Sequence, residues 1–282
     1  MLFRKFLAIC RMVKMEHSVF ALPFAYVGAL LTARSLPGPD VLLPLTTAMV
    51  CIRSFAMAFN RIADLPLDRK NPRTAGRPLV TGEISLRGAC FFCAATATGF
   101  IVSCAAINSV CLALAFPTMA FAALYSYAKR FTRFCHFLLG AVIGLAPVAG
   151  ALSVSPVFDP DCLLPGFAVL FWIAGFDIIY ACLDLDFDRA NGVHSLPACS
   201  GVGPALHISA FCHVNTVIFL FLAGLEYKQA LGWNAALALT AALFLWEHRI
   251  VGEGRLEKAG FAFALNGPIA VLLLIGAAMG ID

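Results

Sequence analysis

Charged residues are scarce in this sequence. Only 13% of its 282 residues are Asp, Glu, Lys or Arg, whereas 61% are hydrophobic. A soluble domain needs about 25% charged residues to cover its surface, so a soluble fold is excluded. The sequence also lacks the ten-residue segments of alternating apolar and polar residues that a membrane β-barrel requires. The composition therefore predicts an all-α integral membrane protein.

Other absences narrow the class of protein further. No second pair of ligands stands at zinc-finger spacing from Cys90 and Cys93, so the cysteines are expected to pack between helices. No small-residue cleavage site follows the basic start, which is therefore interpreted as a cytoplasmic tail. The net charge of +4 lies in short polar segments between apolar stretches, so nucleic acid is not expected as a partner. No protein partner is predicted either.

Apolar stretches long enough to cross a hydrocarbon core of roughly 30 Å recur along the chain. Nine transmembrane helices are expected, at residues 18–33, 42–60, 88–107, 109–127, 134–153, 163–183, 205–224, 231–247 and 260–280. Lys and Arg gather in the segments on one side, while the other side holds only Arg34 and Lys228. This imbalance predicts a cytoplasmic N-terminus. The whole chain, residues 1–282, is expected to form one domain in the lipid bilayer of a bacterial inner membrane.

Two pairs of aspartates, Asp64/Asp68 and Asp184/Asp188, stand at the ends of expected spans. Acid groups at the edge of a bilayer are costly and need a function or a partner. Residues four apart on a helix face the same way, so each pair can hold one hard cation. Asn60, one turn before Asp64, adds a neutral oxygen ligand. With arginines nearby, the pairs predict a magnesium-bridged diphosphate site that faces the cytoplasm.

Further residues near these pairs are expected to take part in a site for an allylic diphosphate or to shape it. Tyr180, one turn before Asp184, either stabilises an allylic cation through its ring face or anchors its helix at the membrane interface. Asp177 lies deeper in the same span, where a role near the pocket is expected. Pro66 removes a helical hydrogen bond, so the sequence leaves open whether the helix stays regular within the first pair. Four basic residues are expected to contact phosphate oxygens: Arg73, Arg77, Lys129 and Arg130.

One arginine, Arg53, lies inside an expected span. It precedes Asn60 by seven residues, two helical turns, so both should line one face with Asp64. A lone intramembrane arginine should face a protein-lined cavity with an anionic partner. The carboxylate of an aromatic acid would supply that partner, and arginine can bind it with two hydrogen bonds. The alternatives are snorkelling and a salt bridge to a neighbouring helix.

In order along the chain, these residues resemble the motifs of the UbiA superfamily of intramembrane prenyltransferases. The family's NxxxDxxxD motif is matched at residues 60–68, its NxRTxxRPL extension at 71–79, and its tyrosine-preceded DxxxD motif at 180–188. Residues 125–130 resemble the family's loop that contacts diphosphate. Arg53 falls where the family carries an arginine linked to the acceptor.

The resemblance implies a UbiA-like bundle around a central cavity, with Mg2+ as cofactor. It implies transfer of a polyprenyl group from a polyprenyl diphosphate to the ring of an aromatic acid, in ubiquinone or menaquinone biosynthesis. Residues 68–74 are similar to the 4-hydroxybenzoate polyprenyltransferase branch. Residues 16–23 and 192–197 are similar to a menaquinone subgroup whose acceptor is a dihydroxynaphthoate. The alternative is a transporter of an anion or divalent cation, whose site would lie near the bilayer midplane.

Overall fold

The computed structural model describes residues 2–15, 18–252 and 255–281, and every regular element in these ranges is helical. Glu16 and His17, part of the segment 16–23 singled out above, lie outside the described residues. Seven helical segments of the described chain are long and apolar enough to cross a membrane. The protein is therefore an integral membrane protein. The expected count of nine spans is not confirmed, because α2 offers only a shorter apolar stretch and α11 is not among the seven.

The chain divides into two compact units, each of which has its own packing. The first comprises Met1–Ser18 and Leu43–Tyr127. Its helices are α1 (Leu2–Val13), most of α3 (Pro39–Asp68), α4 (Leu86–Ile107) and α5 (Ser109–Ala128). A Cβ atom added to Gly99 of α4 would lie 2.8 Å from Cys51 Sγ of α3, so these two helices pack closely. The rings of Phe59 and Tyr127 join α3 to α5, with their centroids 6.0 Å apart.

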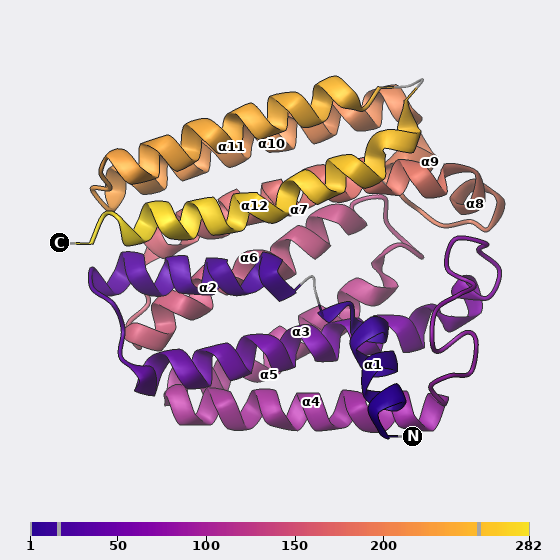
Figure 1. Ribbon diagram of the computed structural model, residues 1–282, viewed down its shortest axis with the longest axis horizontal. Helices are drawn as coiled ribbons and strands as arrows, with labels where there is room; N and C mark the ends of the chain where they lie inside the picture. The colour runs from indigo at the N-terminus through magenta and orange to yellow at the C-terminus, as the bar shows by residue number, and fades with distance from the viewer. Residues whose placement is uncertain (1, 16–17, 253–254, 282) are drawn as a thin grey trace. The chain divides into compact units, whose positions relative to one another are not determined.

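The second unit, Val19–Leu42 and Ala128–Asp282, is organised around α7. This helix (Leu163–Ala181) packs against α6, α10 and α12 and is the most buried of the candidate spans. Helix α11 packs against both α10 and α12, and Figure 1 shows α11 and α12 running side by side. The other elements are α2 (Ser18–Ala33), α6 (Cys135–Val154), η2 (Pro160–Cys162), η3 (Cys182–Asp184), α8 (Leu185–Ala190), α9 (Leu196–Ser200), α10 (Val202–Glu226), α11 (Leu231–Ile250), η4 (Leu256–Lys258) and α12 (Ala259–Ala278).

Glycines bring α6 and α7 unusually close together. A Cβ atom on Gly140 would lie 2.2 Å from the carbonyl oxygen of Leu170, and one on Gly144 would lie 2.7 Å from that of Gly166. Gly140 and Gly144 are four residues apart and share one helix face, as small residues often do where membrane helices cross. Any larger residue at these positions would push α6 away from α7. The glycines thus fix the helix that leads into the second acid pair.

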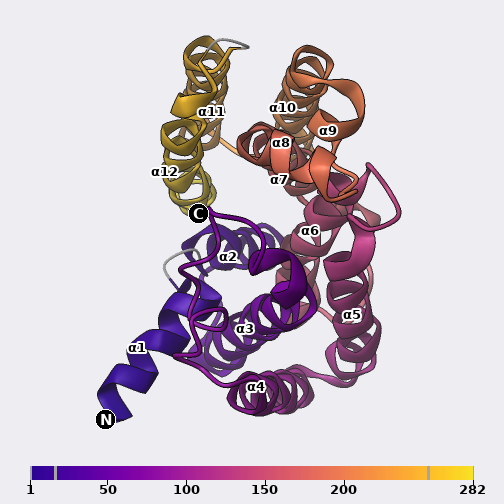
Figure 2. The same ribbon diagram turned by 90° about the vertical axis from the view of Figure 1, so that its right-hand side faces the viewer.

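Two differences between the expected and the observed helices involve the acid pairs. The α3 helix continues beyond the expected end at residue 60 to Asp68, with Pro66 inside it. The helix therefore stays regular through Pro66: proline lacks one N–H, and near the end of a helix this removes only one bond. The irregularity lies instead in the second pair, where α7 ends at Ala181 and η3 precedes α8. The short α8 and α9 lie near the end of α7 (Figure 2).

Candidate active site

Asp64 and Asp68 lie on one buried face of α3. Their exposed fractions are only 2% and 6%. Ala58 and Arg61, which are also buried, precede them on the helix. Successive residues in this set of four are three or four positions apart, so their side chains share one face. Burying a carboxylate without charged or hydrogen-bonding partners is costly. A pair of buried acids at the end of a membrane helix therefore requires cations or strong donors nearby.

The loop that follows α3 folds back onto the first acid pair. Asn71 Oδ1 accepts a hydrogen bond from the N–H of Arg73 at 2.9 Å, and the Thr74 hydroxyl donates to the carbonyl oxygen of Asp68 at 3.0 Å. These bonds shape the turn so that Arg77 Nη1 lies 2.5 Å from Asp68 Oδ2. The structure thus brings the predicted Arg77 to the acid pair. The Arg73 side chain is exposed.

Arg61 is a member of this cluster that the sequence analysis did not single out. It is 8% exposed and interacts electrostatically with Asp64 and Asp68. Its Nη1 donates to Asn60 Oδ1 at 3.3 Å, and its Nε donates to the carbonyl oxygen of Met12 at 3.4 Å. The signal was present in the spacing, because Arg61 precedes the two acids by three and seven residues. Asn60, a predicted metal ligand, is therefore held by Arg61.

Replacing Arg61 should destabilise the first unit. We expect Arg61→Met to cost on the order of 3 kcal/mol, because it leaves two buried carboxylates with less compensating charge. The measurement is the midpoint of thermal unfolding in detergent, with Arg69→Met as the matched control because Arg69 follows the same acids but is exposed. Equal midpoints for the two variants would contradict the role assigned to Arg61.

The second acid pair has a different local geometry from the first. Asp184 ends η3 and directly precedes α8, with φ −103° and ψ 10°, while Asp188 lies within α8. The expectation that one α-helix carries both residues is therefore wrong, because Asp184 ends a 3₁₀ turn and directly precedes the short helix that contains Asp188. Asp188 is 8% exposed and accepts a hydrogen bond from Ser195 Oγ at 2.7 Å. Asp186, between the two, is exposed.

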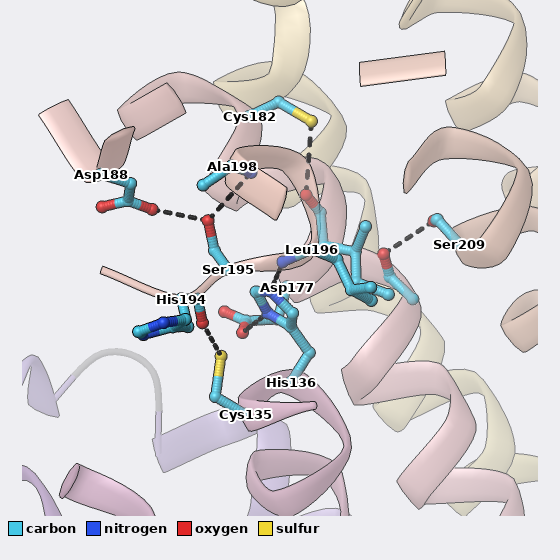
Figure 3. Close-up of polar contacts among 12 residues, drawn as sticks. Cys135, His136, Asp177, Cys182, Asp188, His194, Ser195, Leu196, Ala198 and Ser209 are labelled. Carbon is cyan, nitrogen blue, oxygen red and sulfur yellow. Dashed lines mark hydrogen bonds and ion pairs between the residues drawn. The ribbon is translucent and has the colours of Figure 1, made fainter. Parts of the chain in front are cut away.

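Asp177 is tied to a histidine that the sequence analysis did not single out. Its Oδ2 lies 2.7 Å from Nδ1 of His136, at the start of α6. The other ring nitrogen, Nε2, accepts a hydrogen bond from the N–H of Leu196 at 3.3 Å (Figure 3). His136 and Ser195 are both 3% exposed. The similarity of residues 192–197 to a known segment was the one sequence signal near Ser195, and nothing pointed to His136.

The remaining predicted residues lie on the same elements as the acid pairs or at the ends of neighbouring helices. Arg53 is half-buried on α3, two turns before Asn60. Tyr180 is half-buried in the last turn of α7. Lys129, which is half-buried, and Arg130, which is exposed, follow the end of α5.

The donor atoms of the acid pairs suit magnesium. Mg2+ prefers oxygen ligands and is usually held by one or two carboxylates together with substrate phosphates and water. Among the residues that the structure describes, no group of three or more His, Cys, Asp or Glu could hold a metal. The carboxylates of Asp64/Asp68 and of Asp184/Asp188 supply oxygen donors of the kind that Mg2+ prefers.

The comparison with known protein families decides what class of protein carries these residues. The model of the UbiA prenyltransferase family matches residues 21–279. The chain belongs to this family. It is therefore an enzyme, a UbiA prenyltransferase, and not the transporter that the sequence left as an alternative. The matched region contains every site residue that the sequence predicted, from Arg53 to Asp188.

Individual UbiA relatives agree with this assignment. The chain is 31% identical over 257 residues to a 4-hydroxybenzoate octaprenyltransferase of Alkalilimnicola ehrlichii, covering 88% of this chain and 85% of the relative. A solved UbiA homologue from Aeropyrum pernix K1 superimposes with a TM-score of 0.86 at 36% identity, over 94% of this chain and 98% of the homologue. A UbiA homologue from Archaeoglobus fulgidus bound to GPP and Mg2+ shares the fold, with a TM-score of 0.68 at 23% identity over 95% and 99% of the two chains.

Proposed function

We propose that this UbiA enzyme transfers a polyprenyl group from a polyprenyl diphosphate to the ring of an aromatic acid in quinone biosynthesis. The observation that carries the proposal is the buried Asp64/Asp68 pair with Arg77 held against it. 4-Hydroxybenzoate is the first acceptor to test, because the relative from Alkalilimnicola ehrlichii bears that substrate in its name. A dihydroxynaphthoate is the second, because of the similarity at residues 192–197.

The acid pairs are the proposed holders of the metal. The carboxylates of Asp64, Asp68, Asp184 and Asp188, with the amide oxygen of Asn60, would bind Mg2+. When bound, Mg2+ acts as a Lewis acid that stabilises the charge on the departing diphosphate. The burial of Asp64, Asp68 and Asp188 supports this role, since it holds these carboxylates in place before the substrate arrives.

The basic residues would bind the phosphate oxygens directly. A guanidinium has five N–H donors, so the bond from Arg77 to Asp68 leaves further donors for a phosphate. Arg73, Lys129 and Arg130 are proposed to add contacts of the same kind. Once the allylic carbon–oxygen bond breaks, the cation must be kept from water. Tyr180 is proposed to stabilise it through its ring face.

Arg53 is proposed to serve the aromatic acceptor, whereas the carboxylate of Asp177 is engaged by His136. We expect Arg53→Leu to raise the KM for the aromatic acid about tenfold or more, because a charge-assisted bond to its carboxylate is lost. The KM for prenyl diphosphate should change little, since Arg53 lies two helical turns deeper than Asn60. Steady-state kinetics with each substrate varied in turn measure both constants.

Arg53→Lys is the matched control for this prediction. It keeps the positive charge but loses the planar fork, so its KM for the acceptor should lie between those of the wild type and Arg53→Leu. If only the KM for prenyl diphosphate rises, Arg53 belongs to the leaving-group site instead.

The proposed setting of the reaction is the cytoplasmic face of a bacterial inner membrane. The basic residues around both acid motifs support this orientation, since positive charge stays on the cytoplasmic side. We also propose that residues 1–282 function as a single prenyltransferase domain.

The function is tested by mass spectrometry of products from the purified protein. Isotopically labelled prenyl diphosphates of several chain lengths are offered with 4-hydroxybenzoate, with a dihydroxynaphthoate, or with neither, in Mg2+ or in EDTA. We expect a ring-prenylated product with one acceptor in Mg2+ and none in EDTA. Product from neither acceptor would overturn the assignment to aromatic acids, and full activity in EDTA would overturn the role of the metal.

A further inference from the structure

A short segment, in which Val193 and Ser195 are buried, links the second acid motif to the rest of its unit. Residues Asn191–Ser195 join α8 to α9 and are called here the α8–α9 connection. The N–H of Val193 donates to the carbonyl oxygen of Asp188 at 2.9 Å, and the N–H of His194 donates to that of Lys129 at 2.7 Å. Two consecutive residues of the connection are thus bonded through their backbones, one to the acid motif and the other to the residue that follows α5.

Ser195, the last residue of the connection, orients the carboxylate of Asp188. The N–H of Ala198 donates to Ser195 Oγ at 3.4 Å, so the hydroxyl oxygen is already an acceptor. Its single proton is directed to Asp188 Oδ2, 2.7 Å away (Figure 3). One oxygen of Asp188 is therefore held by a buried serine, which selects one orientation of the carboxylate.

His136 holds the chain immediately after Ser195, and its bonds define its protonation. A backbone N–H can only donate, so His136 Nε2 must accept the bond from Leu196. The ring proton then resides on Nδ1 and is donated to Asp177 Oδ2 at 2.7 Å. Asp177 thereby fixes the tautomer and the ring orientation that Leu196 requires, as a carboxylate does for a histidine whose other nitrogen is in use.

These contacts exclude His136 as a proton acceptor in the reaction. Both ring nitrogens are engaged, and the side chain is 3% exposed. A general base must reach the proton that it abstracts. His136 instead accepts a hydrogen bond from Leu196, the residue that follows the α8–α9 connection, so its effect on the reaction is indirect.

We propose that His136, Asp177 and Ser195 are positioning residues, which hold the α8–α9 connection so that Asp188 keeps the orientation in which it binds Mg2+ with diphosphate. The inference rests on one part of the proposed function, the role of Asp188 as a ligand of the metal, and not on the identity of the acceptor. It gives a physical role to residues 192–197, whose similarity to a subgroup segment was otherwise unexplained.

The apolar packing around the connection makes the proposal testable by substitution. The side chain of Leu196 belongs to a buried cluster with Ala174, Ile178, Ala205 and Cys212. This cluster ties α9 to α7 and α10 independently of the polar contacts. Loss of one hydrogen bond should therefore loosen the connection without unfolding the unit, which size-exclusion chromatography of each variant would check.

The experiment uses two readouts that do not require turnover. The first is the Mg2+ concentration that gives half-maximal binding of geranyl thiolodiphosphate, a diphosphate analogue whose carbon–sulfur bond resists ionisation. The second is hydrogen–deuterium exchange of the amides in residues 193–198. We expect Ser195→Ala and His136→Leu each to raise the half-maximal Mg2+ concentration about tenfold, as loss of an outer-shell partner does at metal sites. His136→Leu should also accelerate exchange.

A series of substitutions at His136 tests whether the hydrogen bond to Leu196 is needed, or only a polar side chain at this position. In His136→Gln the amide oxygen can still accept from Leu196, so this variant should recover much of the wild-type Mg2+ dependence. In His136→Asn the shorter amide can reach Asp177 but not Leu196, so it should behave like His136→Leu. In the double variant of His136→Leu with Ser195→Ala, the half-maximal Mg2+ concentration should exceed that of the stronger single variant by no more than about twofold, because both residues act through one connection.

Ser209→Ala is the matched control. Ser209 is fully buried in the same unit, and its hydroxyl donates to the carbonyl oxygen of Gly175 at 2.7 Å, the same distance as that from Ser195 to Asp188 (Figure 3). Its loss should change neither readout.

Faster exchange at 193–198 with unchanged Mg2+ dependence would overturn the proposal, as would equal effects of Ser209→Ala and Ser195→Ala. If the wild-type protein binds the probe with Mg2+ but prenylates no aromatic acid, the proposed function is refuted and this inference stands. If the wild-type protein shows no Mg2+-dependent binding of the probe, this inference is overturned.

Discussion

Replacing Asp64 with alanine is expected to reduce the turnover of prenyl diphosphate by about a hundredfold or more, while the protein stays folded. Asp64 is 2% exposed on α3 and faces the same side as Asp68. As a ligand of Mg2+ it would stabilise charge that develops only as diphosphate departs, so its loss lowers kcat rather than substrate binding alone. Asp64→Asn should lose about as much turnover, because the amide keeps the shape of the carboxylate but not its charge.

The control for this prediction lies on the same helix. Asp40 is in the first turn of α3 and is exposed, so Asp40→Asn removes an equal charge far along the helix from the acid pair. Its turnover should stay within about twofold of wild type, since exposed substitutions rarely perturb a folded protein. Single-turnover release of diphosphate measures the step directly. Wild-type rates in Asp64→Ala would rule out the first acid pair as a holder of the metal.

Long apolar helices were the part of the fold that the sequence predicted well. Their positions follow from composition alone, because a bilayer requires about twenty consecutive apolar residues for each span. The observed α4, α5 and α6 begin and end within two residues of the expected boundaries. The short elements α8 and α9 were not predicted, since helices of a single turn have no apolar periodicity to mark them.

The acid pairs were predictable, but their local geometry was not. Proline in the first motif suggested a broken helix there, yet α3 runs through Pro66 to Asp68. The break occurs in the second motif, between Ala181 and Leu185, where no proline or glycine marks it. A change from α-helical to 3₁₀ geometry costs little, so tertiary packing can impose it without a local sequence signal.

The partner of Asp177 was harder still to predict, because it comes from a distant part of the sequence. His136 meets Asp177 across 41 residues and Leu196 across 60. Only the packing of α6 on α7 makes these contacts possible. Arg61, by contrast, lies on the same helix as its acids, so its spacing could have identified it.

The local geometry of the second pair leads to the other prediction with a large expected effect. We expect Asp184→Asn and Asp188→Asn each to lower turnover by about a hundredfold, for the reason given for Asp64. The exposed Asp186 lies between them and is the matched control. Asp186→Asn should remain within about twofold of wild type. If it is as harmful as its neighbours, net charge of the segment rather than two specific ligands explains the losses.

Lengthening each side chain should then distinguish the two acids. Asp188 is buried and its Oδ2 is already 2.7 Å from Ser195 Oγ, so the extra methylene of Asp188→Glu has no space and should displace the carboxylate. Asp184 is half-buried at the end of η3, where a longer side chain can rearrange. Asp184→Glu should therefore retain at least about tenfold more activity than Asp188→Glu, since misplacing a ligand by about 1 Å is enough to cost a hundredfold. Turnover at saturating Mg2+ provides the comparison, and equal losses in the two glutamate variants would show that the Ser195 contact does not constrain Asp188.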